Sequence, residues 1–229
     1  AHPSFVKKGY LVEDMKYLSN YKLMEVLNGF RISSAHWDMA LSNGHLVYLI
    51  GNDDSHDVTD MWDVAKRFTM INSPKNEAEH LIQALENGNA VAVDFPVRRE
   101  ETLEQKIKRL KNDVPYMTQI ELCGDTLLIS ASKQMSKIKF IGQDGKELDV
   151  QKNQKTAKYI IQPEDNYVRT VATFKGGVTL YLNPITRHES DEIVKQRLDK
   201  INYPKTIILW TLYVLVIFAL FYIFAIRKF

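Results

Sequence analysis

Cysteine and net charge are both scarce in this sequence. The single cysteine, Cys123, cannot form a disulfide within the chain and belongs to no Cys-x-x-Cys or Cys-x-x-His set, so cysteine usage leaves the redox compartment open. The 30 basic and 28 acidic residues leave a formal charge of +2, and no tract concentrates the excess. Nucleic acid is therefore not an expected partner.

The chain opens at Ala1 rather than at a Met, and no signal-like segment precedes His2. What is present is an ordinary globular balance, with 45% apolar and 25% charged residues in a chain of 229. This balance argues against global disorder. The length predicts one or two domains plus an appendage.

The most informative stretch joins an apolar run, Leu46–Ile50, to the polar segment Gly-Asn-Asp-Asp-Ser-His-Asp at 51–57. A buried strand that stops there places carboxylates and an imidazole at its C-terminal end, where α/β proteins carry their sites. In extended backbone Asp54 and His56 project to the same side and Asp53 to the other. This spacing predicts a metal site, and a plain polar turn is the open alternative.

Several motifs of this sequence resemble one family. The Ala-His-Pro opening at 1–3, followed some fifty residues later by Gly-x-Asp-Asp-x-His, resembles the last metal-binding motifs of the polymerase and histidinol phosphatase (PHP) family of metal-dependent phosphoesterases. Further segments resemble the C-terminal half of such a domain, of the tryptophan-associated phosphoesterase type, and they are Glu25–Asn28, Trp37-Asp38, Leu41–Gly44 and Glu86–Ala90.

The resemblance implies that His2, Asp54 and His56 are metal ligands and that Asp54 and His56 serve catalysis. Mixed nitrogen and oxygen donors suit Zn²⁺, Mn²⁺ or Fe²⁺. The implied reaction is attack of a metal-activated water on a small phosphate ester. An inactive PHP-like scaffold that acts as a membrane-tethered binding module is the alternative of another class.

The same resemblance bears on how complete the chain is. The family's His-x-His pair and its other upstream ligands are absent from this sequence. We therefore expect the chain to be the C-terminal part of a longer or processed protein, with little turnover by itself. An upstream reading frame that encodes His-x-His would confirm this expectation.

Three further side chains need an explanation near the site. Glu25 lies within the apolar run 23–27, and a buried carboxylate costs several kcal/mol unless it is paired or ligates something. A salt bridge at the strand's end and a place beside the site are both open. Lys66 and Arg67 could neutralise a phosphate, or they could simply be solvated.

Residues 1–97 are expected to be α/β, as the C-terminal part of a PHP-type β/α barrel. A helix over 36–44, ending at Gly44, is followed at once by the strand 46–50, an order that favours a parallel sheet. Residues 98–116 should form a connector helix. Short strand-like runs and turn signals over 117–188 predict a small antiparallel β-sandwich.

The end of the chain predicts a membrane anchor. Residues 189–205 form a charged amphipathic linker, and 206–226 are 21 residues without a charge, enough for a helix of roughly 30 Å that spans a bilayer. Basic residues before the span favour domains in the cytoplasm by the positive-inside rule. Large preceding domains and an export signal outweigh such a count, and we expect a single-pass protein of a bacterial cell membrane with its domains outside.

Overall fold

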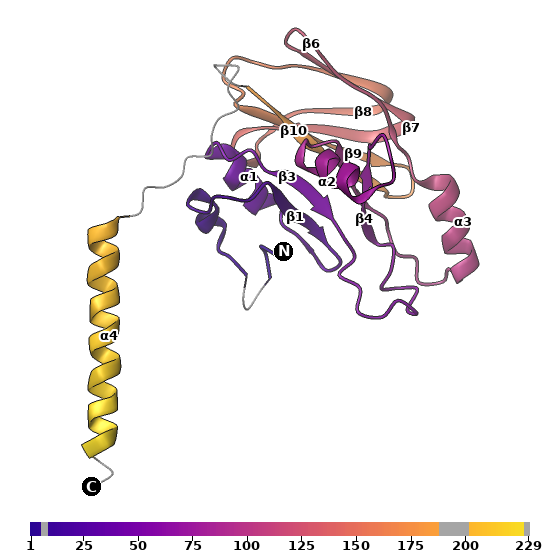
Figure 1. Ribbon diagram of the computed structural model, residues 1–229. Coiled ribbons are helices and arrows are strands. Elements are labelled where there is room, and N and C mark those ends of the chain that lie inside the picture. Colours follow the sequence, from indigo (N-terminus) through magenta and orange to yellow (C-terminus); the bar gives the residue numbers. More distant parts are fainter. Residues whose placement is uncertain (6–8, 188–201, 227–229) are drawn as a thin grey trace. The chain divides into compact units, whose positions relative to one another are not determined.

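The computed structural model describes residues 1–5, 9–187 and 202–226 and divides the chain into two units, Ala1–Arg197 and Leu198–Phe229 (Figure 1). The first unit holds every described strand. The second holds one helix, α4 (Tyr203–Ile226). Most of the expected linker 189–205 lies outside the described residues, and α4 begins three residues before the expected span.

The first unit begins with a small mixed sheet. Its elements are η1 (Val12–Lys16), β1 (Leu23–Asn28), β2 (Arg31–Ile32), α1 (Ser34–Ser42) and β3 (Tyr48–Gly51). The strand order is β2-β1-β3, and β1 runs parallel to β3. Helix α1 ends next to Gly44, whose φ of +80° is left-handed. The predicted helix, glycine cap and parallel strand pair are therefore confirmed.

Packing under α1 explains why this short sheet is stable. Trp37 is fully buried, and its indole N–H donates to the carbonyl of Val47 at 2.8 Å, which ties the helix to the start of β3. Val26 and Leu27 of β1 and Leu49 of β3 are buried in the same apolar cluster. The indole therefore contributes both apolar area and a satisfied polar group.

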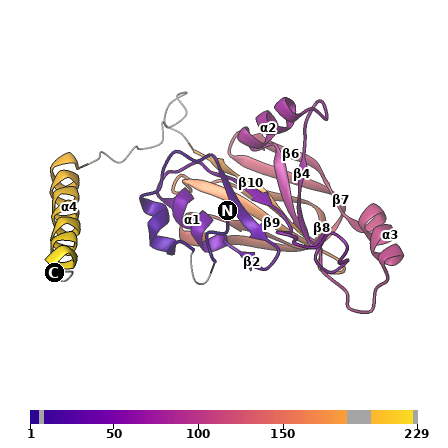
Figure 2. The same ribbon diagram turned by 60° about the horizontal axis from the view of Figure 1, so that its bottom comes forward.

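The remaining strands form one seven-stranded antiparallel sheet in the order β4-β5-β10-β9-β7-β6, with β8 paired to β7. Helices α2 (Ala78–Glu86) and α3 (Leu103–Asp113) and the turn η2 (Gln143–Gly145) connect its strands. The strands are β4 (Arg67–Ile71), β5 (Ala90–Asp94), β6 (Met117–Cys123), β7 (Thr126–Ile141), β8 (Glu147–Ile160), β9 (Tyr167–Phe174) and β10 (Thr179–Thr186). Figure 2 shows α1 and α3 at opposite sides of this unit.

The structure does not support a PHP-type β/α barrel for residues 1–97. Strands β4 and β5 were expected in that barrel, but β5 pairs antiparallel with β10, so the ranges 1–97 and 117–188 share one sheet. The physical reason lies in β5, which is buried on both faces. Ala92 packs in the cluster under α1, and Val93 packs in the core of the large sheet.

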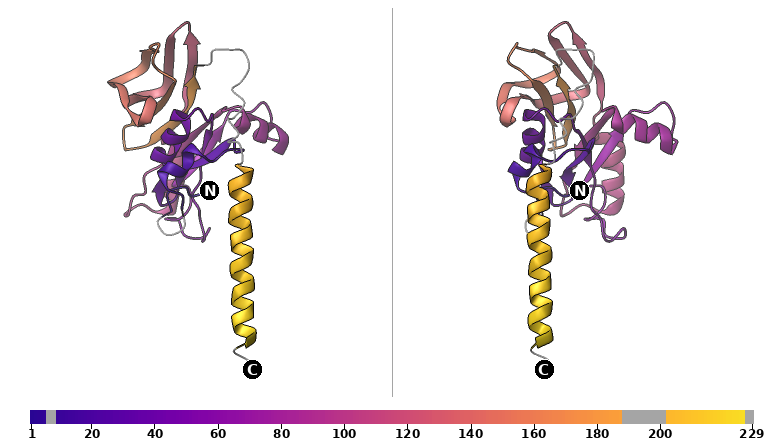
Figure 3. Two further views of the ribbon diagram at one scale, coloured as in Figure 1. Left: turned by 90° about the vertical axis from the view of Figure 1, so that its left-hand side faces the viewer. Right: turned by 60° about the vertical axis from the view of Figure 1, so that its left-hand side comes forward.

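The expected sandwich over 117–188 is also corrected, because its strands belong to one curled sheet rather than to two facing sheets (Figure 3). The runs 126–130 and 137–141 are one long strand, β7. Its core-facing residues change from odd positions, Leu127 and Ile129, to even positions, Ile138 and Phe140. Irregular pairing between 130 and 137 produces this change and bends the strand, so that both halves face one core.

A buried ion pair joins α1 to the large sheet. Arg169 of β9 donates from Nε and Nη2 to the two carboxylate oxygens of Asp38, at 2.6 and 2.7 Å, and the hydroxyl of Tyr167 donates to the same carboxylate at 3.0 Å. Burial and the charge of Asp38 raise the pKa of Tyr167. Because two parallel hydrogen bonds join the guanidinium to the carboxylate, the pair sets the orientation of α1 on the sheet.

Candidate functional site

The polar cluster of this chain lies where the parallel strands β1 and β3 end, beside the N-terminus. Glu25 and Asn28 project from β1 and are each 3% exposed. The Nδ1 atom of His2 lies 2.9 Å from Glu25 Oε2 and 4.0 Å from Asp54 Oδ2. The structure therefore brings together two of the three predicted ligands, His2 and Asp54, from distant parts of the chain.

Glu25 determines how the His2 imidazole is held. Its carboxylate accepts the backbone N–H of His2 at 2.6 Å and a hydrogen bond from the amide of Asn28 at 3.1 Å. An ionised carboxylate only accepts, so Glu25 favours a proton on Nδ1 of the neutral ring, whereas the Asn28 amide nitrogen, 2.8 Å from the same atom, favours a lone pair there. In the tautomer that Glu25 selects, Nε2 carries the lone pair. This is the arrangement by which carboxylates orient metal-binding histidines in many proteins.

The sequence left the role of Glu25 open, and the structure places it beside the site rather than in a surface ion pair. The signal was present, because one acid lay inside an otherwise apolar strand. Asn28, three residues later in the same strand, was not singled out as a site residue. Its Nδ2 atom is 2.8 Å from His2 Nδ1.

The loop after β3 is organised by Asp53. Its carboxylate accepts the backbone N–H groups of Lys66 and Arg67, each at 2.6 Å, and that of Ala65. Asp53 faces these amides while Asp54 faces His2, so the expected opposite orientation of the two acids holds. The first acid folds the loop, and the second is available for chemistry.

A glycine allows this loop to approach β1. A Cβ atom on Gly29 would lie 1.8 Å from the carbonyl oxygen of Asp53, a distance that no side chain could occupy. The close backbone contact fixes the start of the Asp53 loop against the end of β1. It therefore contributes to the position of Asp54 relative to His2.

Two other groups hold the far side of the loop. Asp63 accepts the backbone N–H of His56 at 2.7 Å and pairs with Lys66 at 3.0 Å, and these bonds hold the pKa of Asp63 well below its usual range. Lys106 of α3, 2% exposed, donates to the carbonyls of Met61 and Val64. Burial lowers the pKa of Lys106.

The geometric argument that placed His56 beside Asp54 is wrong. Strand β3 ends at Gly51, and Asp54 has a left-handed φ of +53°, so the alternation of an extended chain does not reach position 56. His56 is exposed, and its backbone N–H donates a hydrogen bond to the carboxylate of Asp63. Its role as a ligand stays a prediction.

Lys66 and Arg67 are engaged rather than free. Lys66 pairs with Asp63 and lies 4.5 Å from the ring centroid of Phe30. Arg67 pairs with Asp94 at 3.2 Å and donates to the backbone carbonyls of Asn28 and Arg31. Both side chains therefore stabilise the loops around the polar cluster, and both also add positive charge there.

The donor set suits a divalent cation only in part. An imidazole and a carboxylate that face each other across 4.0 Å are the right kinds of donor. Within residues 1–5, 9–187 and 202–226, however, no group of three or more His, Cys, Asp or Glu side chains is arranged to hold a metal ion. Two donors fit, and a third does not join them.

No family model, curated protein or solved structure matches this chain. The resemblance to PHP enzymes therefore rests only on the sequence motifs quoted above.

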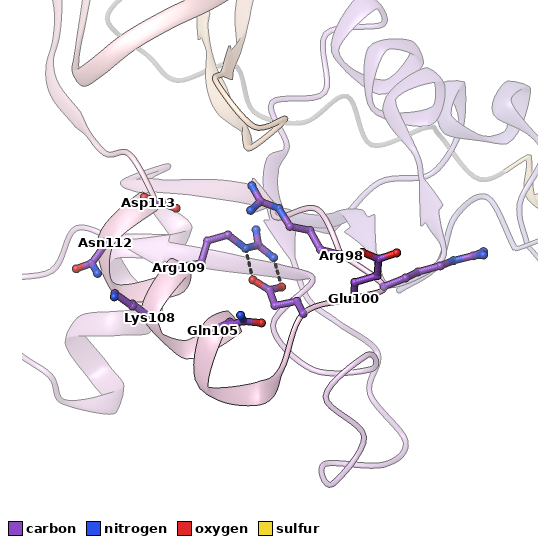
Figure 4. Close-up of a pocket in the computed structure, with 9 residues that line it drawn as sticks. Arg98, Glu100, Gln105, Lys108, Arg109, Asn112 and Asp113 are labelled. Atoms are coloured by element: carbon purple, nitrogen blue, oxygen red, sulfur yellow. Dashed lines mark hydrogen bonds and ion pairs between the residues drawn. The ribbon is translucent and has the colours of Figure 1, made fainter.

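Away from the polar cluster, a hollow of about 730 Å³ lies against α3 and the loop before it (Figure 4). Its main feature is a buried pair in which Arg109 donates from Nε and Nη2 to the carboxylate of Glu101, at 2.6 and 2.7 Å. The guanidinium also lies 3.9 Å from the ring centroid of Phe95. Since both charges are matched, this pair stabilises the α3 region rather than offering a charge to a ligand.

Proposed function

We propose that this chain belongs to a membrane-anchored, metal-dependent phosphoesterase with a PHP-type α/β site. One observation carries the proposal, the approach of His2 to Asp54 at the ends of two parallel strands, with buried Glu25 against the imidazole. The carboxyl ends of parallel strands are where α/β proteins bind their ligands.

In this proposal His2 and Asp54 hold a Zn²⁺, Mn²⁺ or Fe²⁺ ion. Glu25 fixes the tautomer and the direction of the His2 ring, and the Asp53 loop holds Asp54 in place. When bound, the cation supplies Lewis-acid stabilisation of a phosphoryl group and makes a water more acidic. His56, on the same loop, is the predicted third ligand. The substrate is a small phosphate ester.

The test uses the full chain in lipid nanodiscs, incubated with Zn²⁺, Mn²⁺ or Fe²⁺ and then desalted. Metal content is measured by mass spectrometry, and hydrolysis of 4-nitrophenyl phosphate is followed beside it. His2→Ala and Asp54→Ala should lose bound metal, while His80→Ala on α2 should not. Equal metal content in all four proteins would remove the assignment.

A second function has its own supporting observation. Because the described residues contain no three-ligand group, the chain could instead serve as a membrane-tethered binding module on a PHP-like scaffold. Elemental analysis separates the two. A folded protein with far less than one metal per chain, and no hydrolysis, supports the binding module.

The membrane anchor is proposed for α4. This helix is long and apolar enough to cross a bilayer, with Thr206–Ile226 free of charge. We propose a single pass through a bacterial cell membrane with the first unit outside the cytoplasm. Cys123 is exposed and is the chain's one cysteine, so it reports the side. An impermeant maleimide should label it in intact spheroplasts, and labelling only after lysis would place the unit inside.

A further inference from the structure

A separate cleft of about 650 Å³ lies in the first unit, between the loop after β5, the C-terminal end of α3 and the turn that joins β9 to β10. None of its lining residues belongs to the polar cluster around His2. The bend of β7 and the β8 residue Asn153, with a left-handed φ of +56°, complete the wall. Irregular strand positions of this kind often mark binding sites.

The glycine turn decides the shape of the cleft. Gly176 and Gly177 both have left-handed φ values, +83° and +87°. A Cβ on Gly176 would lie 3.3 Å from Nη2 of Arg98, and one on Gly177 would lie 3.1 Å from Pro96. The bare turn therefore lets the loop after β5 pack closely and brings the Arg98 guanidinium to the rim.

Charge is unevenly matched in this cleft. Lys133 donates to the carbonyl of Asn112 at 2.6 Å and lies 3.8 Å from Asp113, so it is occupied by the end of α3. Arg98 and Lys175 are exposed and make no side-chain hydrogen bond or ion pair with another residue of the described ranges. Among the residues that line the cleft, Asp113 is the acid and lies beside Lys133, so the lining carries two cations in excess, with Glu101 close enough to Arg98 for their charges to interact.

The other lining groups complete a small polar site. Ser136 adds a hydroxyl, and buried Phe174 lines the cleft with an apolar ring. Gln134 donates to the carbonyl of Asn153 at 2.7 Å, which ties β7 to β8 across the wall. A volume of this size is typical of sites for small molecules.

We propose that this cleft binds a phosphate monoester. A dianion matches the two cations in excess, the planar fork of Arg98 suits two phosphate oxygens, and Lys175 adds a point charge in the same cleft. The group can be carried by a small soluble molecule or by a lipid headgroup. This binding needs no divalent cation, so it stands apart from the proposed hydrolytic site.

The test is calorimetric titration of the full chain in neutral nanodiscs with phenyl phosphate, in low salt and with EDTA. Saturable binding is expected to weaken at least about tenfold in Arg98→Glu and in Lys175→Glu, because each removes a charge-assisted contact. High salt should weaken it as well. Lys158→Glu, an exposed lysine of β8 outside the cleft, is the matched control.

Glycerol 3-phosphate separates the two sources. Competition with phenyl phosphate supports the site and admits a lipid headgroup as ligand, whereas binding of phenyl phosphate alone supports a soluble aromatic ester. The absence of saturable binding, or equal binding by wild type and both charge reversals, overturns the proposal. Both positions are exposed, so Arg98→Gln and Lys175→Gln should fold normally and give intermediate losses.

Discussion

Glu25 shows how much one buried acid organises. It is 3% exposed, and it accepts from the His2 backbone, from Asn28 and, in the tautomer argued above, from the His2 ring. Removing the carboxylate would take away the acceptor that faces Nδ1 and leave the Asn28 amide as the polar group beside it. The effect should therefore appear at His2 rather than in the overall fold.

Glu25→Ala should shift His2 from the Nδ1–H tautomer towards the Nε2–H tautomer, because the Asn28 amide, which can donate to Nδ1, then remains beside the ring. The readout is ¹⁵N NMR of histidine-labelled protein without metal, with His2→Ala to assign the signal. Any Zn²⁺ affinity should fall roughly 10- to 100-fold. Glu86→Gln, which alters an exposed ion pair with Lys22, is the control. An unchanged His2 spectrum would show that Glu25 does not orient the ring.

Gly29 makes a second prediction at the scale of one residue. Gly29→Ala places a Cβ 1.8 Å from the Asp53 carbonyl, so the backbone must move apart. We expect a clear loss of stability, of about 1–3 kcal/mol, seen as a lower midpoint in thermal unfolding. Gly124→Ala is the comparison, since its Cβ meets nothing within 4 Å and only its left-handed φ of +58° costs energy. Equal losses would contradict the close contact.

At the scale of elements, α3 and the loop after β3 are joined by one side chain. Lys106 crosses from the helix to the carbonyls of Met61 and Val64, and its ammonium is buried there. The loop thus depends on a helix that begins about forty positions later. This dependence connects the loop that carries Asp54 and His56 to the α3 region.

Lys106→Met should loosen this loop, because two carbonyls lose a charged donor while the helix keeps its apolar packing. We expect about 1–3 kcal/mol of lost stability and faster amide exchange over residues 56–66, measured by hydrogen exchange with mass spectrometry. Lys108→Met on the same helix, at an exposed position, should change neither quantity. Unaltered exchange in Lys106→Met would mean that Asp53 alone holds the loop.

Elements were the level at which sequence reasoning worked best. The helix expected over 36–44 lies at 34–42, and the connector helix expected over 98–116 lies at 103–113. The long strand β7 was not expected. Its core-facing residues change from odd to even positions at the bend, so the sequence pattern looks like two separate strands. A bulge depends on neighbouring strands, which a local pattern does not contain.

At the scale of the whole molecule, the described acids predict how stability depends on pH. Hydrogen bonds from Arg109 lower the pKa of Glu101 below its usual 4.5, and those from the His56 backbone and Lys66 lower that of Asp63. Below about 4.5 the unfolded chain binds more protons than the folded one, so the free energy of unfolding falls as pH falls.

Glu101→Gln tests this linkage. Its unfolding midpoint should lie below that of the wild type at pH 7, and the difference should shrink as the pH falls below about 4.5, because the wild type loses the contribution of the ionised carboxylate. Glu164→Gln, at an exposed position, should follow the wild type at every pH. A constant difference between Glu101→Gln and wild type would show that Glu101 contributes by packing and not by charge.

The sequence alone determined the local elements, the apolar span at 206–226 and the candidacy of Asp54, because periodicity, capping and residue chemistry act over a few positions, while His2 became a candidate through the family resemblance. Tertiary structure decided that β5 joins the antiparallel sheet, that Glu25 faces His2 and that the chain leaves extended backbone at Asp54. Those outcomes depend on which distant surfaces bury each other and on one left-handed residue at Asp54. Neither is encoded in a repeat along the chain.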